Sequence, residues 1–371
     1  MNGLAFLQQA YGDRLAAARA AHAAGTPVVG YVGNTVPVEL ITATGCFAVR
    51  IAPVAGDAHR ADAHVESFSD LDTRLIFAAY CEGAYDCLRL LIVPRSTEPL
   101  HKLYLSLREA QRIGLVKSGP ELWLYDILHT QRDSSHAYGL ARTGELLDKL
   151  ASIGGTRPDK AALTDAVALS NQTRLLLQLL QQRRAAHAIS GREAHQATGA
   201  LHFLAPQQGQ AALREWLAAD THTPALGPRL LVTGCPLDHD ALHARVEQSG
   251  ARIVLEDDDW GSRAAAPLVA IGRPPLQALF EHAWRDRPCP RLHPAPLAQS
   301  WLAQALQQPV FDAVLFNLPQ PEDSYGWRFP AARDLVQRAG LPWLLLRRDA
   351  RTATDLPATL CAFIATLPAT A

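Results

Sequence analysis

The sequence of 371 residues has almost no net charge: 35 Lys and Arg side chains stand against 36 Asp and Glu side chains, for a formal charge of −1. A protein without an overall electrostatic field has little with which to hold nucleic acid or an anionic membrane. Long apolar runs are also absent, since none approaches the ~18 residues that a membrane span requires. The start of the sequence lacks the basic flank and apolar core of a secretion signal. We therefore expect a cytoplasmic protein with no nucleic-acid or membrane partner.

Cysteine is sparse, and no Cys-x-x-Cys pair occurs. The thiols are scattered rather than concentrated as in a disulfide scaffold, which predicts reduced cysteines. Familiar catalytic signatures are missing as well: there is no Walker loop, no Gly-x-Gly-x-x-Gly after a strand, no Gly-x-Ser-x-Gly elbow and no His-Glu-x-x-His. Without these motifs, the common nucleotide-binding, hydrolase and zinc-protease functions have no support in the sequence. The motifs present assign no residue as a metal ligand. The cysteines are Cys46, Cys81, Cys87, Cys235, Cys289 and Cys361.

What the sequence does contain is an alternation of short apolar runs with longer helical patterns. Such alternation is typical of parallel strands joined by crossover helices, so the predicted fold class is α/β. With 48% hydrophobic residues, the chain can build the cores of two ordinary domains. The expected strands are 28–32, 49–53, 90–93 and 122–125 in a first set, and 229–232, 252–255, 313–316 and 343–346 in a second.

A long stretch rich in Ala, Leu, Gln and Arg separates the two sets of strands. We predict an N-terminal α/β domain at 1–134, a helical connector at 135–225 and a C-terminal α/β domain at 226–371. The two domains are expected to be doubly wound parallel sheets that face each other across a cleft. In such sheets ligands bind outside the carboxyl ends of the strands, so the functional residues are sought there.

Four polar residues follow predicted strands. Glu39 is in the first turn of a helix, where its charge either complements the helix dipole or serves a site. Thr97 and Glu98 either line the cleft or cap the next helix. Cys235 stands between a strand and a helix, a position in which a helix N-terminus lowers a thiol pKa. These four residues are candidates for the site.

Other polar groups are expected to have structural roles. The acidic run 256–259 is expected to cap a turn and to be solvated. Cys289 is expected in a loop and Cys361 in a core, as small buried hydrophobic residues commonly are. The histidines expected on the surface or in the core rather than as bases are His64, His101, His129 and His136.

Short motifs occur in a fixed order along nearly the whole chain. They are Pro37-Val-Glu-Leu-Ile, Gly45, Gly83-Ala-Tyr-Asp followed by Ile92-Val-Pro, Asn171-x-x-Arg174, Ile189-Ser-Gly, Gly234-Cys-Pro-Leu, Gly250-Ala-Arg-Ile-Val-Leu-Glu-Asp-Asp with Gly261-Ser-Arg, Pro288-Cys-Pro and Ala339-Gly-Leu-Pro. Each motif is weak, but the ordered set resembles the 2-hydroxyacyl-CoA dehydratase and benzoyl-CoA reductase family, as a D-component-like subunit.

The resemblance implies two flavodoxin-like domains that form one half of a heterodimer. It also implies three cysteine thiolates per subunit that hold a [4Fe–4S] cluster in the interdomain cleft. An ATP-dependent activator would deliver one electron, and radical chemistry would occur on an acyl-CoA thioester. The cluster suits this chemistry because no amino-acid side chain generates the ketyl-type radical that it needs.

The sequence departs from the family pattern at the three ligand positions. The register that the resemblance gives puts Asp70 at the first cysteine, Thr97 and Glu98 at the second, and the cysteine-free segment 318–325 at the third. A small error of register would not restore the ligands, because no cysteine lies within a few residues of these positions. We therefore expect the chain to lack a [4Fe–4S] cluster of its own, and we expect that cluster in a homologous partner subunit.

Three functions remain open. The favoured one is a cluster-free subunit that supports a cluster-bearing homologue, because the Gly, Pro and apolar patterns persist while the ligand positions are changed. An independent enzyme is the second, with another reaction at Asp70, Thr97, Glu98 or Cys235. The third is a ligand-binding or scaffold protein that has lost its chemistry.

The second function has a metal-dependent form. The carboxylates of Asp70, Glu98, Glu322 and Asp323 would converge if the domains close. Oxygen ligands of this kind favour a hard divalent ion over an iron–sulfur cluster.

Overall fold

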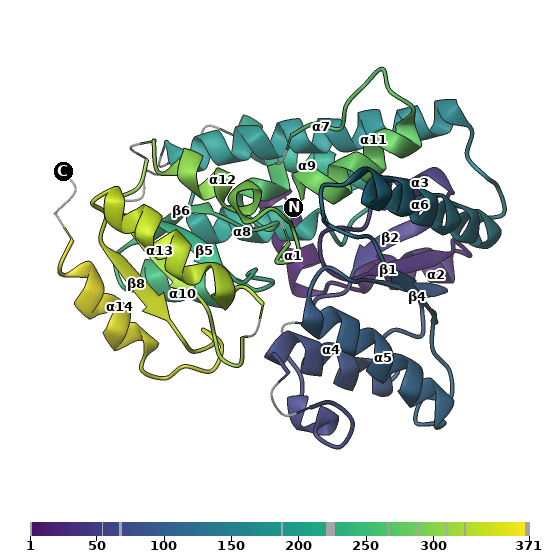
Figure 1. Cartoon of the computed structure of the whole chain (residues 1–371), viewed down its shortest axis with the longest axis horizontal. Coiled ribbons are helices and arrows are strands. Elements are labelled where there is room, and N and C mark those ends of the chain that lie inside the picture. The colour runs from purple at the N-terminus through teal and green to yellow at the C-terminus, as the bar shows by residue number, and fades with distance from the viewer. Residues whose placement is uncertain are drawn as a thin grey trace.

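The computed structural model describes residues 2–53, 55–66, 69–186, 188–219, 227–265, 267–287, 289–308, 310–322 and 324–367. It contains two four-stranded parallel sheets with helices around them, which confirms the predicted α/β class with two doubly wound domains (Figure 1). Among the helices described, none is both long and apolar enough to cross a membrane.

All eight predicted strands are present. The first sheet has the order β2-β1-β3-β4 and the second the order β6-β5-β7-β8. Most strands differ from the prediction by one or two residues at an end. The largest shift is in β2, which begins two residues and ends three residues earlier than expected, because the segment Phe47–Arg50 pairs in register with β1. The strands are β1 (Val28–Tyr31), β2 (Phe47–Arg50), β3 (Leu90–Pro94), β4 (Glu121–Tyr125), β5 (Arg229–Gly234), β6 (Arg252–Glu256), β7 (Ala313–Asn317) and β8 (Trp343–Leu346).

The strand order explains where a ligand would lie. In each sheet the second strand in sequence lies on one side of the first and the third strand lies on the other, so the chain reverses direction at β1/β3 and at β5/β7. Crossover helices leave a crevice outside the carboxyl ends of strands at such a reversal. Each sheet therefore offers one crevice, at the end of β1 and β3 or of β5 and β7.

Helices cover both faces of each sheet. Alternate residues of β3 enter different cores: Leu91 belongs to the core that includes residues of α1 and α4, whereas Leu90 and Ile92 belong to the core that includes residues of α6. The α-helices are α1 (Gly3–Gly12), α2 (Ala16–Ala23), α3 (Val38–Ala43), α4 (Leu71–Cys81), α5 (Glu98–Arg112), α6 (Asp133–Gly154), α7 (Lys160–Ala185), α8 (Gly191–Ala200), α9 (Pro206–Ala218), α10 (Ala241–Gln248), α11 (Pro275–Glu281), α12 (Ala295–Ala305), α13 (Phe329–Arg338) and α14 (Leu356–Ile364). Shorter turns are η1 (Ala58–Ala61), η2 (Ser262–Ala265), η3 (His282–Asp286) and η4 (Gly326–Arg328).

The stretch between the sheets is helical, as its composition predicts, and consists of α6 to α9. It is not a separate layer, because α7 contacts α3 at one end and β6 at the other (Figure 1). The expected domain boundary at 134/135 falls near the start of α6, and the expected boundary at 225/226 lies outside the described residues. The division into three segments stays a prediction.

Two buried ion pairs attach α7 to its neighbours, one to α3 and one to β6 of the second sheet. Arg174 donates to Glu39 at 2.6 Å, and Arg184 donates to both carboxylate oxygens of Glu256 at 2.5 Å. All four side chains are at most 5% exposed. Burial alone would raise the pKa of Glu39, but the guanidinium groups of Arg174 and Arg287 outweigh it and lower the pKa to about 2. Glu39 thus has a specific cationic partner rather than only a helix dipole.

We predict that Glu39→Ala lowers the free energy of unfolding by about 3–5 kcal/mol, since it leaves the Arg174 charge buried and unpaired. Equilibrium urea denaturation followed by circular dichroism measures the loss. The control is Glu98→Ala, which removes a more exposed carboxylate paired with Arg291 and should cost at most about 1 kcal/mol. Equal effects of the two substitutions would contradict the assignment of Glu39–Arg174 as a supporting pair.

Candidate functional site

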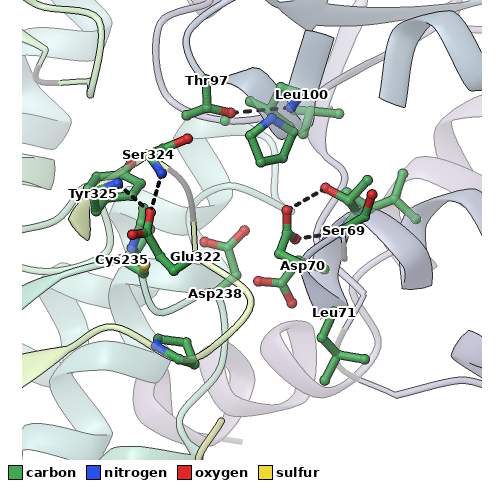
Figure 2. Close-up of a pocket in the computed structure, with 18 of the residues that line it drawn as sticks. Ser69, Asp70, Leu71, Thr97, Leu100, Cys235, Asp238, Glu322, Ser324 and Tyr325 are labelled. Carbon is green, nitrogen blue, oxygen red and sulfur yellow. Dashed lines mark hydrogen bonds between the residues drawn. The ribbon is translucent and has the colours of Figure 1, made fainter. Parts of the chain in front are cut away.

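The two crevices form one cavity of about 180 Å³ between the carboxyl edges of the sheets. Loops that follow β1, β3, β5, β6, β7 and β8 line it, together with the N-terminus of α4. The strand-end rule, applied to the sequence, thus leads to a shared site rather than to one site in each domain. Figure 2 shows Asp70 and Glu322 on facing sides of this cavity.

The N-terminal side of the cavity consists largely of helix starts. Asp70 is the N-cap of α4: its carboxylate accepts hydrogen bonds from the backbone N–H and the hydroxyl of Thr73, both at 2.8 Å. Thr97 is the N-cap of α5, and its hydroxyl accepts a hydrogen bond from the Leu100 N–H at 3.2 Å. Short oxygen-bearing side chains satisfy the free amides of a helix start. Both residues therefore have a capping role in addition to lining the cavity.

The C-terminal side is formed by the loops after β5 and β7. The carboxylate of Glu322 accepts hydrogen bonds from the backbone N–H groups of Ser324, at 2.6 Å, and of Tyr325 and Gly326. The N–H of Cys235 donates to the Asn317 carbonyl at 2.8 Å. The cysteine-free segment after β7 is thus held in a tight turn by its own glutamate.

Cys235 lines the cavity, but its environment is the reverse of the one expected. Burial, followed by the carboxylates of Glu322 and Asp70, raises the pKa of its thiol well above the ordinary value. The helix that was to stabilise a thiolate, α10, starts only at Ala241, so its amides are too far along the chain to do so. At neutral pH Cys235 is a protonated thiol.

The other candidates lie outside this cavity. Glu98 is not among the residues that line it, and Arg291 donates to its carboxylate at 2.6 Å. Glu39 borders a second cavity of about 590 Å³ between α3, α7 and the α8–α9 turn. Of the carboxylates expected to converge, Asp70 and Glu322 share the cavity, Glu98 does not, and Asp323 lies outside the described residues.

Asp70 has an unusual protonation equilibrium. Burial, with a contribution from the neighbouring Asp72 charge, raises the pKa of Asp70 to about 6. Asp72 itself is paired with Arg351 at 2.6 Å, and Arg351 also binds Asp349 at 2.7 Å. The cavity therefore holds a carboxyl group that can gain or lose a proton near neutral pH.

The acidic run after β6 is buried, contrary to the expectation that it is solvated. Glu256 is fully buried, and Asp258 and Asp259 are each 6% exposed. Asp258 does cap a turn, since its carboxylate accepts from the backbone N–H groups of Trp260 and Gly261. Burial is possible because the run lies at the junction of the two sheets, where arginines compensate its charge.

The most important residue that sequence analysis missed is Arg50, at the end of β2. It is 2% exposed and forms ion pairs with Asp259 and Asp238, two carboxylates of the C-terminal half. The predicted strand 49–53 contains Arg50, so the strand-end rule pointed to residues after it, whereas the observed strand ends at Arg50 itself. Its partners lie 188 and 209 residues away in sequence, and nothing local indicates them.

The loop after β8 was also missed. Asp349, Ala350 and Arg351 of this loop line the cavity. The strand-end rule that selected the loop after β7 applies equally to the loop after β8 and would have selected these residues. The expected positions of two cysteines are reversed as well: Cys289 is buried at the cavity and Cys361 is exposed.

A family model described as 2-hydroxyglutaryl-CoA dehydratase, D-component, matches residues 34–359. The chain belongs to this D-component family. The match includes the cavity-lining residues from Asn34, after β1, to Arg351, after β8, and Val32 and Gly33 lie just before it. A search of curated proteins gives no match.

The donor atoms of this D-component cavity do not fit a [4Fe–4S] cluster, which is held by cysteine thiolates. Among the described residues that line the cavity, Cys235 and Cys289 are the thiols, and burial raises the pKa of both. The nearest alternatives are carboxylates, which are hard ligands that iron–sulfur clusters do not favour. The positions given to cysteine by resemblance hold helix caps and a glutamate turn instead.

We predict that Asp70 makes the D-component less stable as the pH rises from about 4 to about 6. In this window the unfolded chain has released the Asp70 proton, whereas the folded chain, with its raised pKa, still retains it. Asp70→Asn keeps an N-cap but cannot ionise. Its unfolding free energy relative to the unchanged protein should therefore increase by on the order of 2 kcal/mol between pH 4 and pH 7.

Urea denaturation at several pH values measures this difference. The matched control is Asp159→Asn, which makes the same change at the exposed N-cap of α7. If both variants follow the same pH dependence, the folded environment of Asp70 does not raise its pKa.

Proposed function

We propose that the chain is a subunit of a two-component 2-hydroxyacyl-CoA dehydratase that has no [4Fe–4S] cluster of its own and supports a homologous, cluster-bearing subunit. One observation carries the proposal. The three positions that the family resemblance gives to cysteine ligands are Asp70, Thr97 and the segment around Glu322, and all three lie at the same cavity. In the proposed function this cavity corresponds to the cluster site of the family, with other side chains at the ligand positions.

The changed residues support this proposal because each of them is useful to the fold. Asp70 and Thr97 cap α4 and α5, and Glu322 binds three backbone N–H groups. The helix starts and the turn at the edge of the cavity would therefore keep their hydrogen bonds without the cysteine ligands. The family membership supports a dehydratase-type component, and the acyl-CoA thioester, the heterodimer and the ATP-dependent activator are parts of the proposal.

In this function the chain binds other components of the complex and performs no redox chemistry itself. Its two sheets would close one side of the complex, border the acyl-CoA pocket or contact the activator, while electron transfer and radical chemistry occur on the partner. The protonated thiol of Cys235 and the carboxyl group of Asp70 would take no part in electron transfer. Each of them could only gain or lose a proton.

A second candidate is an independent acid–base enzyme. The observation that favours it is the pKa of about 6 of Asp70, in a cavity that a small ligand can enter. Buried carboxyl groups with raised pKa values are suited to general acid–base catalysis. In that case the isolated chain would turn over a substrate, and Asp70→Asn would abolish the turnover while Asp159→Asn would not.

We predict that the chain produced alone under anaerobic conditions contains no stoichiometric iron or sulfide. Produced with a homologue that retains the cysteines, it should elute from size-exclusion chromatography as a heterodimer with about four iron and four sulfide ions on the partner. Metal and sulfide analysis with electron paramagnetic resonance checks this result.

A cubane cluster in the isolated chain would overturn the cluster-free proposal. A chain that never binds such a homologue, and binds an acyl-CoA thioester without converting it, would instead be a binding protein. Acyl-CoA turnover by the chain alone would establish the independent enzyme.

A further inference from the structure

A separate group of metal-binding side chains lies where the helical stretch meets the second sheet. It consists of His195 on α8, His243 on α10 and Glu256 at the end of β6. All three are fully buried, and their candidate ligand atoms lie within 4.8 Å of one another. None of them lines the cavity described above.

The imidazole of His195 has no hydrogen-bond partner at either nitrogen among the described residues. A buried polar atom without a partner costs free energy, so such atoms are uncommon in folded proteins. The ring cannot turn toward solvent, because it is stacked on Trp260 with centroids 5.7 Å apart and lies 4.4 Å from the ring of His243. Nδ1 of His243 also lacks a partner.

Glu256 is oriented by its neighbours. Its Oε1 lies 2.5 Å from Nε2 of His243, and Arg184 donates to both of its oxygens. Arg184 is fixed in turn by hydrogen bonds to the carbonyl of Ile253, at 3.0 and 2.7 Å. Carboxylates that bind metals are commonly held by second hydrogen bonds of this kind, which set their orientation.

We propose that His195, His243 and Glu256 bind a zinc ion. Two imidazole nitrogens and one carboxylate oxygen are a ligand set that zinc accepts, with a fourth position left for water. Zinc binding gives one of the two ring nitrogens of His195 a partner. It replaces the hydrogen bond between His243 and Glu256, and His243 keeps its proton on the other ring nitrogen. Glu256 remains bound to Arg184.

The zinc ion would connect two parts of the chain. His195 belongs to the helices between the sheets, whereas His243 and Glu256 belong to the second sheet and its first helix. The ion would lie beside Trp260, whose ring also stacks with the Arg50 guanidinium that lines the cavity. It would therefore fix the helices between the sheets against the second sheet, next to the Arg50 side chain that lines the cavity. The inference does not depend on the proposed function.

The experiment uses the full chain, stripped with a chelator and then dialysed against zinc chloride. We expect about one zinc ion per chain by mass spectrometry of the metal content, a higher thermal midpoint with zinc than without it, and visible ligand-field absorption when cobalt replaces zinc. His195→Ala and His243→Ala should lose the ion. His22→Ala, on the exposed face of α2, should retain it and controls for surface histidines.

The proposal is overturned if the unchanged chain takes up no stoichiometric zinc. It is also overturned if the His195 and His22 variants bind zinc equally. If the alanine variants do not fold, His195→Gln preserves much of the ring volume, and the cobalt spectrum of the unchanged chain still reports whether nitrogen ligands bind the ion. A spectrum of hexa-aqua cobalt would count against the site.

Discussion

The site depends on one buried arginine. Arg50 ends β2 in the first sheet, and its guanidinium binds Asp259 and Asp238 in the second half of the chain. A buried charge must be compensated by an opposite charge. Burial of Arg50 therefore requires that the two aspartates stay next to it, which holds the carboxyl edges of the two sheets together. Arg351 makes the corresponding contact from the other side, to Asp72 at the start of α4. The cavity exists because these contacts cross between the sheets.

The chemistry of the cavity follows from the way its walls are built. Its N-terminal wall consists of helix starts, where any side chain must also satisfy free backbone amides. Asp70 and Thr97 accept hydrogen bonds from such amides at the starts of α4 and α5. The burial that such walls impose raises the pKa of Asp70 and of the Cys235 thiol. At these two positions the cavity favours the protonated side chain over the thiolate that a cluster needs.

Much of the fold could be predicted, because strands in parallel sheets are short apolar runs and helix caps are local. All eight strands and the capping by Thr97 are of this kind. The environment of Cys235 could not be predicted, since the local pattern indicated helix amides and the carboxylates around it come from distant loops. The acidic run 256–259 has the composition of a solvated turn, and only its arginine partners reveal that it is buried.

The sequence by itself determined the α/β class, the strand ends at which a ligand would lie and the absence of cysteine at the positions in question. These properties depend on the identity and spacing of neighbouring residues. The tertiary structure alone decided which strand ends share a cavity, which carboxylates are paired, and that His195 meets His243 and Glu256. Such contacts join residues tens to hundreds of positions apart, and their energies depend on burial, which no local pattern encodes.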